Sequence, residues 1–171
     1  MPETYINPEM RHAIGSIERQ EVSFPISESD VRKWAMAVYY PEVPPRLFWD
    51  AAYAAGTRYG GIVAPEDFNP FAWTSAEGPA PARKGDVGVN RREIELGITP
   101  PPVSNQLNGG VEVEFGARMR PGDVITSVTR LHSYTEREGR LGLMLFTTSE
   151  TTWTNQDDEV VKVSRNIHIR Y

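Results

Sequence analysis

The chain has 171 residues and a net charge of −5, and 39% of its residues are hydrophobic and 24% charged, proportions that fit one globular domain. The acidic balance argues against nucleic acid as a partner, because neutralising phosphates requires a clustered basic face. There is no cysteine, which excludes disulfides, thiolate nucleophiles and cysteine-bound zinc. No metal-ligand cluster, membrane-spanning run or signal peptide is recognisable, so we expect a cytoplasmic protein without a metal or a membrane partner.

Two helices are predicted in the first third of the chain. Ser27 and Asp30 have the spacing of a helix cap, and apolar residues follow at helical intervals. These residues are Val31, Trp34, Ala35 and Val38. A second helix is predicted from Pro44-Pro45 to a cap at Gly56, because proline suits a first helical turn and glycine a helix end. Its apolar face is Phe48, Ala51, Ala52 and Ala55, and the small alanines predict close packing against a sheet.

The second half of the chain predicts consecutive antiparallel strands. Residues 66–108 contain many prolines and glycines and are interpreted mostly as loop, with a short strand from Arg91 to Ile98. From Gly109 onward, alternating segments are separated by turns at 137–139 and 155–158. Helices followed by a strand meander predict an α+β fold, in a single domain covering residues 1–171.

The last strand shows the clearest alternation. Its apolar set is Val161, Val163, Ile167, Ile169 and Tyr171, and its polar set is Lys162, Ser164, Asn166, His168 and Arg170. The polar set predicts the exposed side of the strand, which leaves His168 at the surface or in an interface. Exposure is also expected for His132 and for Glu112 and Glu114, which share one strand face.

Several segments, in order and spacing, resemble a known family. Residues 41–46 read Pro-Glu-Val-Pro-Pro-Arg, residues 59–65 read Tyr-Gly-Gly-Ile-Val-Ala-Pro, and Asn108-Gly109-Gly110 and Arg120-Pro121-Gly122-Asp123 follow. From about Ile14 to Tyr171 the chain resembles the MaoC-like (R-specific enoyl-CoA hydratase/dehydratase) family, in particular its N-terminal dehydratase domain. The resemblance implies a hot-dog fold, in which an antiparallel sheet wraps around a central helix. It also implies pairing of two such units and an acyl-CoA or acyl-carrier thioester substrate between them, with no further cofactor.

The chain departs from this family where the chemistry lies. Active members have Asp-x-Asn-Pro-x-His in the first segment and His-Gly at the end of the second. Here Pro41 stands for the Asp, Arg46 for the His and Pro65 for the Gly. Arginine is always protonated and cannot serve as a base, and proline has no N–H to donate to an oxyanion. No catalytic residue is therefore assigned to this chain.

The resemblance implies a set of substrate-contacting positions. These are Arg46, Tyr59, Gly60, Gly61, Val63, Pro65, Asn108, Gly109 and Gly110. Arg83 and Lys84, or Arg118 and Arg120, are candidates for contacts with the CoA diphosphate. Solvated surface charges and plain turns are the alternative interpretations of these residues.

The expected function is that of a pocket-forming subunit of a heteromeric 2-enoyl-CoA hydratase or (3R)-hydroxyacyl dehydratase. Its partner would be a catalytic MaoC-like hot-dog chain that supplies the Asp and His. Two alternatives stay open. One is a self-sufficient homo-oligomeric hydratase or thioesterase that uses another carboxylate, such as Asp50 or Glu66. The other is a non-enzymatic acyl-CoA-binding scaffold.

Overall fold

A five-stranded antiparallel sheet forms the body of the protein, in a computed structural model that describes residues 4–72 and 88–171. Its strands are β1 (Ile17–Val22), β2 (Gln106–Phe115), β3 (Thr126–Gly139), β4 (Gly142–Thr154) and β5 (Val160–Arg170), in the order β1-β3-β4-β5-β2. The helices are α1 (Pro8–Ala13), α2 (Glu28–Tyr39), α3 (Ala51–Ala55) and α4 (Arg91–Glu95), with the 3₁₀ turns η1 (Arg46–Phe48) and η3 (Gly88–Asn90). The predicted α+β class is confirmed.

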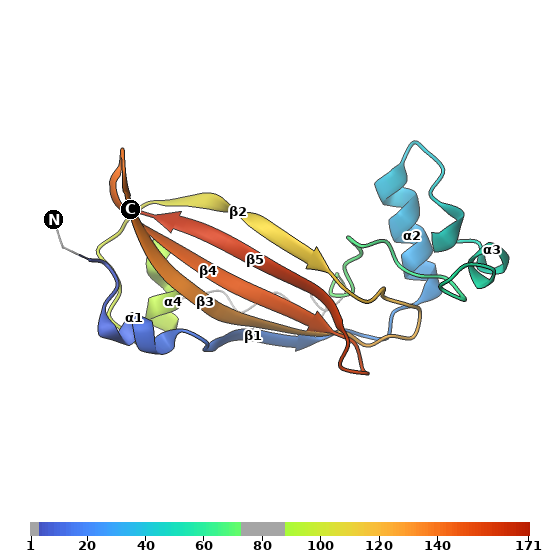
Figure 1. Ribbon diagram of the computed structural model, residues 1–171, viewed down its shortest axis with the longest axis horizontal. Helices are drawn as coiled ribbons and strands as arrows, with labels where there is room; N and C mark the ends of the chain where they lie inside the picture. The colour runs from blue at the N-terminus through green and yellow to red at the C-terminus, as the bar shows by residue number, and fades with distance from the viewer. Residues whose placement is uncertain (1–3, 73–87) are drawn as a thin grey trace.

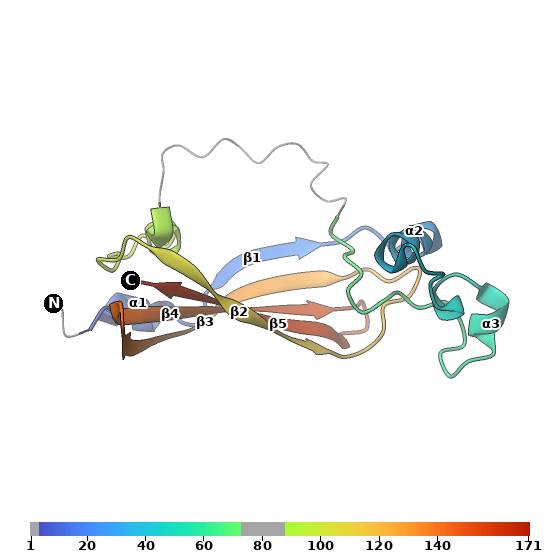
Figure 2. The same ribbon diagram turned by 90° about the horizontal axis from the view of Figure 1, so that it is seen from above.

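The helices gather at the two ends of the long strands. Figure 1 shows α2 and α3 beyond one end of the sheet and α1 and α4 at the other end. Figure 2, seen from above, shows α4 over one face of the sheet. We call this covered side the inner face.

Helix α2 begins where the capping signal predicts. The Ser27 hydroxyl accepts a hydrogen bond from the Asp30 N–H at 3.0 Å, which pairs one of the free N–H groups of the first turn. Val31 and Ala35 are fully buried. The predicted helix and its cap are confirmed.

The alanine-rich segment differs from the expectation. Instead of one helix from Pro44, the chain forms η1 and then the five-residue α3, capped by Asp50 and ending at Gly56. Ala54 is buried, whereas Ala51, Ala52 and Ala55 are exposed. The predicted alanine face is therefore wrong, because α3 packs beside η1 at the end of the sheet rather than on a sheet face.

Other elements also differ from their predictions. The β3–β4 turn consists of Arg140 and Leu141, not residues 137–139, and residues 91–95 form helix α4, not a strand. Strand β1 was not predicted, because Ile17–Val22 lacks clear alternation and is exposed at the edge of the sheet.

Strand β5 alternates as predicted, but its polar set does not simply face solvent. Arg170 is 1% exposed, and His168, two residues earlier, is half-buried on the same inner face. The prediction of an exposed polar side is wrong at this end of the strand. An arginine can be buried when carboxylates and other acceptors surround it, and periodicity alone does not reveal such partners.

The core divides into clusters along the inner face. Near α1 and α4, Met10 packs with Leu131, Tyr134 and Leu145. At the opposite end a larger cluster includes Val31, Phe68 and Ile125. In the part of the chain that the structure describes, no helix is long and apolar enough to cross a membrane.

Candidate functional site

Arg46, which the resemblance aligns with the family's catalytic His, is held by its own neighbours. Its Nε and Nη2 donate to one carboxylate oxygen of Asp50, at 3.0 and 2.7 Å, and its guanidinium lies 4.7 Å from the centre of the Tyr53 ring. Because a guanidinium stays protonated, this residue has no basic lone pair to accept a proton. Pro41, which the resemblance aligns with the family's Asp, is exposed.

The second predicted segment is anchored in the core. Val63 is fully buried and packs with Ala35 and Phe48, which brings this segment against η1 and α2. The Ala64 N–H donates to the Met119 carbonyl at 2.8 Å, and Pro65 is buried. The segment holding Val63 and Pro65 therefore lies close to the one that follows Arg46. Pro65, which the resemblance aligns with the family's oxyanion donor, has no N–H to donate.

A basic cavity of about 460 Å³ opens beside Tyr59. Arg58 donates to the Tyr59 hydroxyl at 2.6 Å, and Arg120 donates to the Tyr59 carbonyl at 2.6 Å. The hydrogen bond and charge of Arg58 lower the pKa of the Tyr59 phenol. Arg118 forms an ion pair with Glu66 at 2.7 Å. The cavity holds an excess of positive charge, with three arginines against two glutamates.

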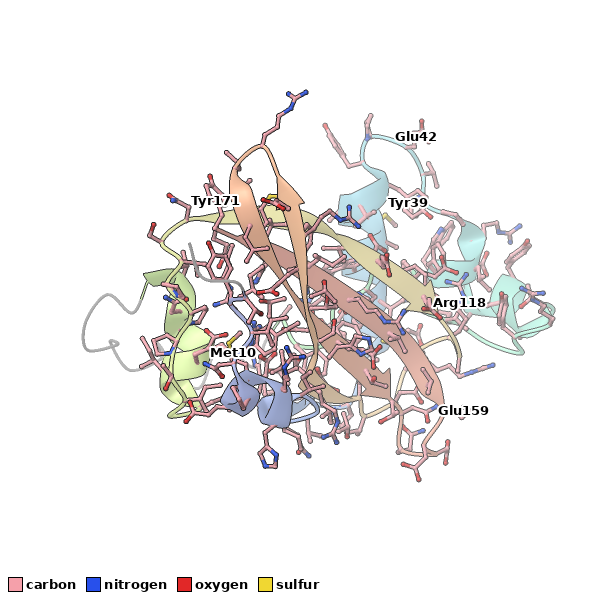
Figure 3. The ribbon with its side chains drawn as sticks, turned by 60° about the vertical axis from the view of Figure 1, so that its left-hand side comes forward. Met10, Tyr39, Glu42, Arg118, Glu159 and Tyr171 are labelled. Atoms are coloured by element: carbon pink, nitrogen blue, oxygen red, sulfur yellow. The ribbon has the colours of Figure 1, made fainter. Side chains whose placement is uncertain are left out.

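Figure 3 labels Arg118 and Glu159, which both line this cavity, at the end of the sheet near α2 and α3. Arg58 and Glu159 were not predicted. A lone arginine and a turn glutamate carry no sequence signal, and only the fold places them beside Tyr59. Gly60 and Gly61 directly follow Tyr59, and Gly60 has φ +67°, a conformation that favours glycine.

Asn108, Gly109 and Gly110 lie elsewhere, in a bulge of β2 opposite His168 and Ile167. A Cβ on Gly109 would lie 2.7 Å from Cγ2 of Ile167, so this glycine is required by packing between the strands. Gly116, which lines the basic cavity, comes six residues after Gly110. At the rise of a strand, six residues span about 20 Å. The structure therefore does not bring these three residues to the Tyr59 cavity.

The other candidate residues have ordinary structural settings. Asp50 caps α3 by accepting the Tyr53 N–H at 3.0 Å, and this bond together with Arg46 lowers the pKa of its carboxyl. His132 and the strand glutamates Glu112 and Glu114 are exposed, as predicted. Arg83 and Lys84 fall outside the described residues.

The described residues that line the Tyr59 cavity include three arginines and no histidine. Hydration of a 2-enoyl thioester needs a base for water, an acid for C2 and a donor for the enolate oxygen. The resemblance aligns Pro41, Arg46 and Pro65 with the three family positions for these tasks. Within residues 4–72 and 88–171, no cluster of three or more His, Cys, Asp or Glu could hold a metal ion.

Comparison with known proteins gives the fold and then the family. The chain resembles solved hot-dog proteins, which confirms the predicted hot-dog fold. Residues 12–164 match the model of the FAS1-like dehydratase domain region, and the chain belongs to this family. No curated protein matches it in sequence.

Three solved structures illustrate the likeness. A MaoC-like dehydratase from Rhodospirillum rubrum is 18% identical, with a TM-score of 0.54 over 93% of this chain and 92% of that one. The ChsH1-ChsH2 complex from Mycobacterium tuberculosis gives 15% identity and a TM-score of 0.60 over 91% and 89%. The HadBC (3R-hydroxyacyl-ACP dehydratase) complex, also from M. tuberculosis, gives 16% and 0.52 over 91% and 96%.

Proposed function

We propose that this chain is the non-catalytic subunit of a heteromeric 2-enoyl-CoA hydratase or (3R)-hydroxyacyl dehydratase. It forms part of the acyl pocket, and a second hot-dog chain supplies the Asp, the His and the oxyanion donor. The observation that carries the proposal is the state of Arg46, a permanent cation tied to Asp50 at the position of the base. Two of the similar structures are complexes of two named chains, which supports a partner of this kind.

The outer strand β2 supports the need for a partner. Val111, Val113 and Phe115 alternate on one side of this strand and are 54%, 41% and 46% exposed. They lie opposite Asn166, Ser164 and Lys162 of β5, and so they share the inner face. An edge strand with unpaired backbone groups and exposed apolar side chains favours association with another chain.

The basic cavity supports binding of a phosphate-bearing thioester. Arg58, Arg118 and Arg120 surround Tyr59 at the end of the sheet. Arginine is well suited to phosphate because its planar donors match the phosphate oxygens. We assign the diphosphate of CoA, or the phosphate of a carrier-protein arm, to this cavity.

Co-expression with a candidate catalytic chain tests the function. The partner should carry an intact Asp-x-Asn-Pro-x-His segment, and hydration of 2-enoyl-CoA is assayed with each chain alone and with the complex. We expect full turnover in the complex, none by this chain alone, and loss of turnover when the partner's His is replaced by Ala. Turnover by this chain alone would refute the proposal.

A matched variant addresses the self-sufficient alternative. Asp50→Asn keeps a side-chain oxygen that can cap α3 but removes the carboxylate. The complex should retain its kcat, because a carboxylate with a lowered pKa that is already bound to Arg46 is a poor base. A loss of turnover in Asp50→Asn, without a loss of folding, would favour the alternative.

A further inference from the structure

A second cavity, of about 550 Å³, lies under α4 at the other end of the sheet. Residues of β1, α4, β2 and β5 line it, and none of them belongs to the Tyr59 cavity. Its volume is in the range of small-molecule sites, about 300–1,000 Å³. One water occupies about 30 Å³, so the cavity can hold a group much larger than a bridging water.

Arg170 lines this cavity from β5 and is held in place from the other side. Both of its terminal nitrogens donate to the buried Glu93 carboxylate at 2.8 Å. Nη2 also donates to Thr147 at 2.9 Å. Among the described residues, its buried Nε has no hydrogen-bond partner. Because this atom is buried, it does not face the cavity, and Arg170 contributes a fixed, paired cation to the cavity wall.

The remaining polar groups of the cavity offer further hydrogen bonds. His168 is two residues before Arg170, and Gln106 is at the start of β2. Neither side chain has a hydrogen-bond partner among the described residues. Burial, with the positive charges of Arg92 and Arg170, lowers the pKa of His168. The imidazole is therefore neutral at pH 7, with one donor and one acceptor nitrogen.

The fixed charges around the cavity are balanced. Arg91 pairs with Glu95, Arg92 with Glu18 and Arg170 with Glu93. Ile17, Val89 and Leu96 add apolar surface to the lining. Among the lining residues that the structure describes, no excess charge is left to attract an anion or a cation, whereas the side chains of His168 and Gln106 remain without partners.

We propose that this cavity binds an uncharged, oxygen-bearing group, a ketone or a hydroxyl on an apolar frame. In the assembled enzyme this group is the far end of the acyl chain, a step that rests on the proposed function. The cavity's own preference for a neutral oxygen-bearing group rests only on His168, Gln106 and the paired charges around them.

Titration with three fragments of similar size tests this preference in the chain without any thioester. The probes are cyclohexanone, cyclohexanecarboxylate and cyclohexylammonium, and the readouts are NMR signals of His168 and calorimetric affinity. We expect cyclohexanone to shift the His168 signals and to bind at least tenfold more tightly than either charged probe. Stronger binding of a charged probe, or no shift at His168, would overturn the proposal.

Matched variants locate the binding. His168→Phe should weaken cyclohexanone binding at least tenfold, whereas His132→Phe, at an exposed histidine on β3, should leave it unchanged. Gln106→Leu, at an exposed position, gives a second variant that retains the fold and should also weaken binding. Equal binding by all variants would overturn the assignment. Because no thioester or partner chain is used, such a failure leaves the proposed subunit role to its own assay.

Discussion

At the residue level, the proposed function depends on three positions. The resemblance aligns Pro41, Arg46 and Pro65 with the family's acid/base pair and oxyanion donor, and neither proline nor arginine can perform those tasks. The side chains that can contribute to substrate binding are hydrogen-bond donors. Arg120, which lines the basic cavity and holds the Tyr59 carbonyl, is one of them.

Arg120→Gln should raise the KM of the assembled enzyme for a CoA thioester about three- to tenfold and leave kcat unchanged, because uniform binding is lost. Steady-state kinetics of the complex measures this split. Arg140→Gln, in the β3–β4 turn, is the control and should change neither constant. An unchanged KM in Arg120→Gln would remove the cavity from the substrate site.

Arg170→Ala should lower the free energy of unfolding by about 3–5 kcal/mol, because it leaves Glu93 buried and unpaired. Arg165→Ala breaks ion pairs with Glu114 and Glu150, but these lie at the surface and should cost less than about 1 kcal/mol. Urea unfolding of both variants measures the difference. Equal losses would contradict the buried role of Arg170.

The same pair makes stability depend on pH. Burial raises the pKa of Glu93, but hydrogen bonds and charge from Arg170 and the hydrogen bond from Tyr134 outweigh it, so the pKa lies below its ordinary value of 4.5. A lowered pKa stabilises the fold fully above pH 4.5, and this stabilisation is lost as the pH falls through the folded-state pKa. The free energy of unfolding is measured for wild type and Glu93→Gln between pH 3 and 7. It should fall less steeply with decreasing pH in the variant. Parallel declines would exclude Glu93 as a cause.

At the level of elements, the bulge in β2 depends on the packing of Gly109 against β5. Gly109→Ala would place a Cβ 2.7 Å from Ile167 Cγ2 and 3.0 Å from the Ile167 carbonyl oxygen. We expect a loss of about 1–3 kcal/mol from this overpacking. Gly61→Ala, where a Cβ meets nothing within 4 Å, should cost far less. Thermal unfolding compares the two, and an equally stable Gly109→Ala would refute the packing argument.

At the scale of the whole molecule, the open edge of the sheet predicts the assembly. Val113→Lys, on the exposed inner side of β2, should prevent complex formation with the catalytic chain, because a buried lysine would be left without a partner. Leu141→Lys, in the exposed β3–β4 turn, is the control and should assemble normally. Size-exclusion chromatography with light scattering measures both. A complex with Val113→Lys would place the interface elsewhere.

The features that could be predicted are those that depend on residues close together in the sequence. The Ser27 cap, the Asn155–Asp158 turn and the alternation of β5 depend on near neighbours, so the sequence indicates them directly. The helix α4 and the face of Arg170 depend on partners far away in the chain. Glu93 and Arg170 are 77 residues apart and meet only in the folded protein.

The sequence alone was enough to predict the β3-β4-β5 part of the meander and the capped α2, whereas β2 pairs with β5 instead of lying beside β3. The sequence also limits the chemistry open to Pro41, Arg46 and Pro65. Residue identity settles such questions because proline has no N–H and arginine no basic lone pair at any position in a fold. The folded structure was needed to show where Tyr59 meets its arginines and where the polar end of β5 is buried. Those outcomes depend on which side chains the sheet brings together, and local propensity does not encode this.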